Sequence, residues 1–226
     1  MAAHLDLEEQ EQLEQLKAFW KRWGNLITWL ITAALAAFAA WQGWNWHQRD
    51  QAAQAAAMYE EFDRALTAQD LDKAAVAVAD LKARFAGTSY ATQAGLQIAR
   101  LQLDKDKADD ARQSLAWVAE HGADGAPYRD LARLRLAGLQ IDAKAYDEAL
   151  KTLDAIKTPE YAALAADRRG DLLLQQGQRD AARAEYQKAL AGIDKAQDYR
   201  RLVEAKLATL GVPTVVEATN AVGAAQ

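Results

Sequence analysis

The sequence contains no cysteine, and this absence excludes several kinds of chemistry. Among its 226 residues there is no thiol to form a disulfide, to act as a nucleophile or to bind a metal ion. Only three prolines occur, and alanine is frequent, a combination that favours helices. No stretch has the alternating or β-branched pattern of a convincing strand. We therefore expect an all-α protein.

The chain also lacks an excess of basic charge. Its formal net charge is −5, and neither residues 1–23 nor residues 47–226 contain more bases than acids. Proteins that bind nucleic acid need a basic surface to displace the counterions of the phosphate backbone. The sequence therefore predicts no nucleic-acid partner.

The residue patterns of an active site are missing as well. The histidines are scattered, with no second ligand at a helical spacing: His4, His47 and His121. Residues 122–125 form a glycine-containing turn without the lysine and the strand of a phosphate-binding loop, and no serine lies in a nucleophile elbow. The acids of residues 104–110 alternate with lysines, which favours a solvated turn over a cation site. We expect no enzyme, no cofactor, no metal ion and no small-molecule substrate.

What the sequence does contain is a long uncharged stretch, from Trp23 to Gln48 with His47 counted as neutral. A helix of about 20 apolar residues can cross the hydrocarbon core of a bilayer. Tryptophans prefer the membrane–water interface, and five of them flank the apolar centre of this stretch: Trp20, Trp23, Trp41, Trp44 and Trp46. We predict a transmembrane helix over residues 24–46, with these five side chains at the membrane interfaces.

Two other interpretations of this stretch remain at this point. A buried core helix of a soluble protein would normally carry charges on one face, and the stretch has none. A cleaved signal peptide would explain the small residues Ala37 and Ala39 on either side of Phe38. The long acidic leader before the stretch and the tryptophans after it argue against cleavage.

The flanking charges predict an orientation. Bases are unequally distributed around the span, with Lys17, Lys21 and Arg22 before it and Arg49 after it. Because lysine and arginine favour the cytoplasmic side, we expect the amphipathic leader, residues 1–23, in the cytoplasm. Residues 47–212 would then lie outside the cytoplasm.

Residues 47–212 repeat a unit of two helices. Four short stretches with a common acid-and-alanine pattern begin the second helix of each unit: Leu71 to Ala74, Ala108 to Ala111, Tyr146 to Ala149 and Arg179 to Ala182. Their final alanines are 37, 38 and 33 residues apart. A period near 34 with paired helices is typical of tetratricopeptide repeats. We predict a tetratricopeptide-repeat-like solenoid of about four helix pairs.

The units differ in how well they match. In the fourth unit, Gly170 and Ala182 should let the helices approach closely while Tyr186 fills the space between them. The first unit has Phe62 where a small residue is expected, so it should diverge and can continue directly from the membrane helix. A terminal helix is expected to cap the stack through Leu202, Ala205, Leu207 and Leu210. Residues 213–226 are small and weakly patterned, and we expect them to be disordered.

Stacks of this kind present a concave groove, lined by the first helix of each pair, to proteins or peptides. The repeat register predicts the groove residues Leu96, Arg100, Leu131, Leu134, Asp167 and Asp171. This mixture of apolar and charged side chains suits a protein or peptide ligand. For each residue, ordinary packing or solvation is the alternative.

The order of these features resembles the YfgM-like ancillary subunits of the SecYEG translocon of Gram-negative bacteria. The resemblance rests on the acidic leader, the two borders of the span and two stretches of the repeats: residues 7–17, Trp20 to Asn25, Trp41 to Trp46, Ala86 to Ala91 and Gly170 to Tyr186. It implies a single-pass inner-membrane protein with a periplasmic repeat domain. It also implies association with the translocon and with a membrane-anchored periplasmic prolyl-isomerase-like chaperone, which would receive newly translocated proteins.

Two alternative functions remain. A scaffold subunit of another cell-envelope assembly or secretion machine would show the same span and repeats, and only the identity of the partner distinguishes it. An envelope enzyme or its regulatory subunit is the other alternative, without a catalytic motif in its favour.

Overall fold

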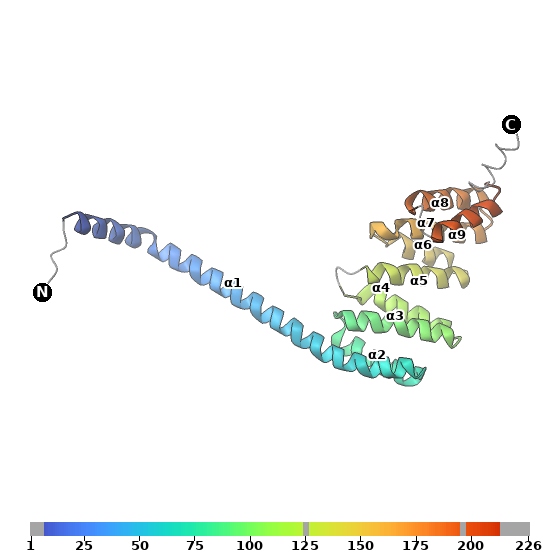
Figure 1. The fold of residues 1–226 in the computed structure, drawn as a ribbon, viewed down its shortest axis with the longest axis horizontal. Coiled ribbons are helices and arrows are strands. Elements are labelled where there is room, and N and C mark those ends of the chain that lie inside the picture. The colour runs from blue at the N-terminus through green and yellow to red at the C-terminus, as the bar shows by residue number, and fades with distance from the viewer. Residues whose placement is uncertain (1–6, 124–126, 195–197, 213–226) are drawn as a thin grey trace, which may run out of the picture. The chain divides into compact units, whose positions relative to one another are not determined.

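The computed structural model describes residues 7–123, 127–194 and 198–212, apart from the side chains of residues 7–12. Over these residues all regular elements are helices (Figure 1), as predicted for an all-α protein. They are α1 (Leu7–Thr67), α2 (Leu71–Phe85), α3 (Ser89–Asp104), α4 (Ala108–His121), α5 (Tyr128–Asp142), α6 (Tyr146–Asp154), the 3₁₀ turn η1 (Pro159–Tyr161), α7 (Ala162–Gln175), α8 (Arg179–Gly192) and α9 (Asp198–Thr209). The predicted disordered tail and the first six residues of the leader lie outside the described residues.

The chain divides into two compact units, Met1–Gln51 and Ala52–Gln226. The first unit holds the apolar stretch, and helix α1 is the one helix, among the residues described, that is long and apolar enough to cross a membrane. Most large apolar side chains of α1 between Leu13 and Trp46 are exposed, for example Trp29 at 70% and Leu35 at 63%. A core helix would bury such side chains, so the structure argues against the core-helix interpretation.

In the second unit the helices form pairs that stack one upon the next, with α2 near one end and α8 and α9 at the other (Figure 1). The second helix of each pair begins where the sequence pattern predicted: α2 at Leu71, α4 at Ala108, α6 at Tyr146 and α8 at Arg179. The first helix of the first pair is the C-terminal part of α1, which is continuous with the apolar stretch. The prediction of about four helix pairs and a terminal helix is therefore confirmed.

The same turn ends the first helix of all four pairs. Each turn contains one residue in the left-handed conformation: Gln69, Asp106, Lys144 and Gly177. The amide of the following residue then donates to a carbonyl five positions back, as in the bond from Gln178 N to Leu173 O of 2.9 Å. This bonding satisfies carbonyls that the end of a helix leaves free. One repeated turn geometry therefore produces the regular alternation of paired helices.

Small residues allow the paired helices to approach closely. A Cβ atom at Gly170 would lie 2.4 Å from Cε1 of Tyr186, and one at Gly95 would lie 2.5 Å from Cγ2 of Val118. Tyr186 itself is fully buried between α7 and its neighbours. The predicted role of Gly170 and Tyr186 is therefore confirmed, because no side chain larger than hydrogen fits beside this ring.

The first pair uses an aromatic cluster where the other pairs use small residues. Phe62 is fully buried in a core formed by α1, α2 and α3. The ring of Tyr59 lies 5.6 Å from the rings of both Phe62 and Tyr90, and its hydroxyl accepts a hydrogen bond of 2.9 Å from Nε2 of Gln97. The divergent first helix pair is thus a well-packed variant of the repeat.

A buried carboxylate joins the third and fourth pairs. One oxygen of Asp130, in α5, accepts hydrogen bonds from the amides of Lys157 and Thr158 and from the hydroxyl of Thr158, at 2.6–3.0 Å. The other oxygen forms an ion pair with Arg133. Burial alone would raise the pKa of Asp130, but these bonds stabilise the charged form and lower the pKa to about 2. The connection between α6 and α7 is thereby fixed to α5.

Helix α9 caps the stack, as predicted, and the predicted burial of Leu207 and Leu210 is confirmed, but Val203 is buried in place of Leu202 and Ala205. It buries Val203 and Leu207 against α7 and α8, and Leu210, directly after the helix, is buried with them. Leu202 remains 49% exposed, and Ala205 is exposed. The spacing of four residues places Val203 and Leu207 on one face of the helix. The expected contact of Leu202 and Ala205 was therefore wrong.

Candidate partner-binding groove

A trough follows the first helices of the second, third and fourth pairs. It consists of two adjoining cavities of about 390 and 320 Å³ that share Gly138, Asp142 and Arg168. Apolar side chains of α3, α4, α5 and α7 form much of its lining, and arginines line it as well. We call this trough the concave groove.

The structure brings most of the predicted groove residues together. Leu96, Arg100 and Leu134 line the larger cavity, and Asp171 lines the smaller one. Leu96 and Leu134 are 6% and 7% exposed, so these two side chains form the floor. Arg100 is exposed to solvent.

Two of the predicted residues lie elsewhere. Leu131 is half-buried and packs against the core between α3, α4 and α5, and it lines neither cavity. Asp167 is fully buried. Counted back from the left-handed turn residue, Asp167 occupies the same repeat position as Leu96 and Leu134. A carboxylate at a buried position must be paired, and its partners come from the capping helix.

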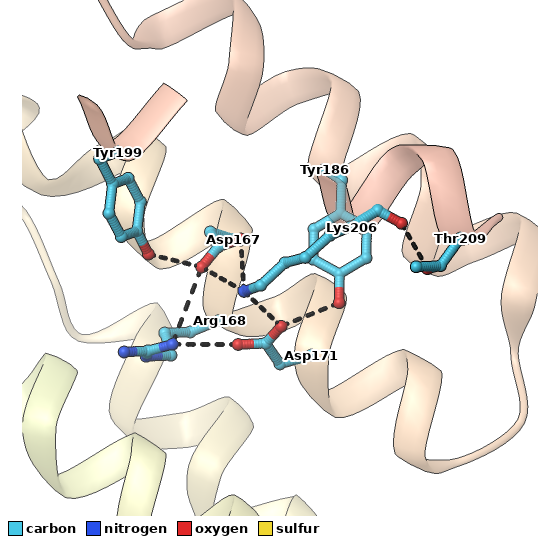
Figure 2. Close-up of polar contacts among 7 residues, drawn as sticks. All are labelled: Asp167, Arg168, Asp171, Tyr186, Tyr199, Lys206 and Thr209. Atoms are coloured by element: carbon cyan, nitrogen blue, oxygen red, sulfur yellow. Dashed lines mark hydrogen bonds and ion pairs between the residues drawn. The ribbon is translucent and has the colours of Figure 1, made fainter. Parts of the chain in front are cut away.

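Lys206 of α9 reaches the two aspartates of α7. Its ammonium nitrogen lies 2.8 and 2.9 Å from the two carboxylate oxygens of Asp167 and 2.7 Å from Oδ1 of Asp171. Figure 2 shows the ammonium placed between both carboxylates. The two charges that the sequence assigned to the groove are therefore bound by a lysine of the same chain.

Three further side chains complete this cluster (Figure 2). The hydroxyl of Tyr199 donates to Asp167 at 2.6 Å, and the hydroxyl of Tyr186 donates to Asp171 at 2.8 Å. Nη1 of Arg168 lies 3.0 Å from Asp171. Burial and then the neighbouring carboxylates raise the pKa of both tyrosines. Both hydroxyls therefore remain protonated donors at neutral pH.

The groove that remains is positively charged. With Asp167 and Asp171 bound by Lys206 and Arg168, its open cations are Arg100 and Arg135, which are exposed and make no hydrogen bond or ion pair within the described part of the chain. Asp142 is the exposed acid of the lining. Guanidinium groups bind carboxylates in a fixed, often bidentate geometry. The arrangement can bind a segment that carries both apolar side chains and carboxylates.

Sequence reasoning missed Arg135 and Gly138. Arg135 follows the predicted Leu134 directly, and Arg168 lies 33 residues further on, so the repeat period was an available signal for a row of arginines. Gly138 is half-buried in the lining, and a Cβ atom there would meet nothing nearer than Nε of Arg168 at 4.0 Å. The groove is thus open above Gly138.

Neither the groove nor the rest of the described chain brings together three His, Asp or Glu residues in a group suited to a metal ion. In the first unit, the tryptophans predicted at the membrane interfaces are all exposed: Trp20 58%, Trp23 45%, Trp41 59%, Trp44 65% and Trp46 70%. The ring of Trp20 covers Gly24, at 3.0 Å from where a Cβ atom would be. Their position at a membrane interface stays a prediction.

Comparison with known proteins places the chain in a family. Three relatives carry the name Ancillary SecYEG translocon subunit. The relative from Neisseria gonorrhoeae is 29% identical over 93% of this chain and 100% of its own length. Those from Escherichia coli and Haemophilus influenzae are 28% and 27% identical, over 79% and 81% of this chain and 85% and 89% of their own lengths. These names confirm the resemblance inferred from the sequence, and they agree with the expectation of a non-enzymatic protein. A family model described as a tetratricopeptide repeat-like domain matches residues 17–212, and the protein therefore belongs to the tetratricopeptide repeat-like domain family.

Proposed function

We propose that this protein is a single-pass inner-membrane subunit that associates with the SecYEG translocon and holds its repeat domain in the periplasm. The observation that carries this proposal is the extent of the similarity. The relative from Neisseria gonorrhoeae aligns over 93% of the chain, so the similarity includes the apolar stretch as well as the repeats. The exposed apolar surface of the first unit suits a helix surrounded by lipid.

The two units have separate tasks in this proposal. Residues 1–46 anchor the chain and associate with the translocon. The concave groove binds the second partner that the family resemblance implies, a membrane-anchored periplasmic chaperone related to prolyl isomerases. Anchoring both proteins in one membrane raises their effective concentration without any new contact. A groove of modest affinity is then sufficient to direct newly translocated proteins to the chaperone.

The groove can be tested at Gly138. A phenylalanine there would project into the open space above the helix, because no atom lies within 4.0 Å of a Cβ position except Nε of Arg168. We expect Gly138→Phe to reduce the chaperone that co-purifies with the intact protein by at least about tenfold, equivalent to ~1.4 kcal/mol. Gly138→Ala is the matched control and should retain it. Equal retention by both variants would exclude the groove as the binding site.

The orientation can be tested because the chain has no cysteine. A single thiol introduced by Lys188→Cys, at a side chain 64% exposed in α8, reports on which side of the membrane the repeats lie. A membrane-impermeant maleimide should label it in intact spheroplasts. Labelling only after lysis would place the repeats in the cytoplasm, and recovery of the labelled protein in the soluble fraction would indicate a cleaved signal peptide.

A further inference from the structure

Within the described part of residues 52–212, no element covers the outer face of the first helix pair. In the stack, each second helix packs against the pair that follows it: α2 packs against α3 and extends Lys82 over Trp117 of α4. Within the part of residues 52–212 that the structure describes, no pair precedes α1 and α2. The position that the second helix of a preceding pair would occupy is therefore open.

A cavity of about 670 Å³ marks this position. It is lined by Met58 and Ala65 from α1 and by Val76 and Ala77 from α2, with four acids and two bases around them. We call it the α1–α2 face. Tyr59 points the other way, because its hydroxyl is bonded to Gln97 of α3. The α1–α2 face and the packed interior thus lie on different sides of the same two helices.

Val76 is the most apolar feature of this face. It is 66% exposed, more than any other large apolar side chain described between residues 52 and 212. Removing an exposed valine side chain from water is favourable, and a helix laid along the cavity would bury it together with Ala77 and Met58. The face therefore offers an apolar stripe to a helix.

The charges around the apolar stripe indicate the sign of the charge that the occupant should carry. Glu61, Asp72 and Asp80 line the cavity and make no hydrogen bond through their side chains and no ion pair within the described part of the chain. Asp70 is paired with Lys73 at 3.0 Å, and Arg64, the other base of the lining, donates to the carbonyl of Glu60 at 3.2 Å. The lining therefore carries four acids and two bases. A second copy of this chain would bring the same acids against themselves, which is unfavourable. A helix with lysine or arginine beside its apolar stripe is complementary.

Helix α2 itself shows what such an occupant looks like. In its own position against α3 and α4, it buries Leu81 and Phe85 and places Nζ of Lys82 at 5.0 Å from the centre of the Trp117 ring. We propose that the α1–α2 face binds a basic amphipathic helix of a partner protein, which extends the solenoid by one second helix. This surface is distinct from the concave groove, whose charge is of the opposite sign.

The absence of cysteine makes a trapping experiment possible in the intact protein. Val76→Cys supplies a single thiol at the centre of the face, and Ala184→Cys supplies one at an exposed position of α8. The probes are two helical peptides of the length of α2, 15 residues, with identical leucine stripes, one central cysteine and either lysine or glutamate beside the leucines. Protein in an uncharged detergent is equilibrated with each peptide in a glutathione buffer, and mixed disulfides are quantified by mass spectrometry relative to the glutathione adduct.

We expect the lysine peptide to react with Val76→Cys at least about tenfold more than with Ala184→Cys, and about tenfold more than the glutamate peptide does. Adding Asp72→Lys and Asp80→Lys to Val76→Cys should abolish most of this preference, while far-UV circular dichroism confirms that the variant is folded. Equal yields for both peptides or for both thiols would overturn the proposal. A disulfide between two copies of Val76→Cys as the main product would also overturn it, because the occupant would then be a second copy of the chain.

Discussion

Two glycines in equivalent helices should respond in opposite directions to the same substitution. Gly138 lies in α5 with no atom nearer than 4.0 Å to a Cβ position, whereas a Cβ atom at Gly170 of α7 would lie 2.4 and 2.5 Å from two carbons of the Tyr186 ring. Alanine is favoured over glycine inside a helix by about 0.5–1 kcal/mol. Gly138→Ala should therefore raise the free energy of unfolding by about that amount.

Gly170→Ala should lower the free energy of unfolding, because the ring of Tyr186 has no room to move. Tyr186 is fully buried, and its hydroxyl is bonded to Asp171 at 2.8 Å. Overpacking costs typically about 1–3 kcal/mol, and the loss of a hydrogen bond to a charged group costs about 1.5–3 kcal/mol. After the helix-propensity gain is subtracted, the net destabilisation is about 2–5 kcal/mol.

Urea unfolding of the intact protein in detergent, followed by far-UV circular dichroism, measures both effects. Adding Tyr186→Leu to Gly170→Ala tests the cause, because removal of the ring removes the clash. The double variant should be less destabilised than the sum of the two single variants. If Gly170→Ala were as stable as the wild type, or if its effect simply added to that of Tyr186→Leu, the packing argument would be refuted.

Three further predictions use the same unfolding measurement. Lys206→Met leaves the fully buried Asp167 without its ammonium partner and should lower the free energy of unfolding by about 3 kcal/mol. Lys188→Met, at an exposed pair 4.0 Å apart, is the control and should change it by less than about 0.5 kcal/mol. Similar effects of the two substitutions would contradict the role of the cluster. The pKa of Asp130 is lowered from 3.8 to about 2 in the folded protein. This shift adds about 2 kcal/mol to the free energy of unfolding above pH 3.8, and the contribution is lost as the pH falls toward 2. The difference in the free energy of unfolding between the wild type and Asp130→Asn should shrink by about 1 kcal/mol between about pH 6 and pH 3. A difference that stays constant would argue against the hydrogen bonds and ion pair of the Asp130 carboxylate. Lys144→Gly, at φ 61°, should stabilise by about 1 kcal/mol by relieving left-handed strain, and destabilisation would contradict that reason.

The parts of the fold that depend on local rules could be predicted from the sequence. The second helices begin where an acid and an alanine follow a turn, because turn geometry and helix capping depend on a few adjacent residues. The close approach at Gly170 could also be predicted, since the distance between two positions of one helix pair is fixed by the repeat. The uncharged stretch identified the apolar part of α1 by length alone.

The parts of the fold that depend on contacts between the capping helix and the helix pairs could not be predicted from the sequence. Lys206 lies 39 residues after Asp167, and nothing in its neighbourhood distinguishes it from a solvated lysine. The register of α9 was also ambiguous, because Leu202 and Val203 are adjacent and only docking decides that Val203 is buried. The positive charge of the groove follows from this docking, since Lys206 neutralises the two acids that the sequence assigned to the groove.

The central claim is that residues 1–46 associate with the translocon. The intact protein and a variant with residues 1–46 replaced by an unrelated single-span anchor are purified from bacterial membranes in mild detergent, and co-purified proteins are quantified by mass spectrometry. We predict that SecYEG subunits accompany the intact protein and are lost from the anchor variant. Recovery of another envelope assembly without the translocon would contradict the account and favour a scaffold of that assembly. Equal recovery of SecYEG with both anchors would contradict the role of residues 1–46.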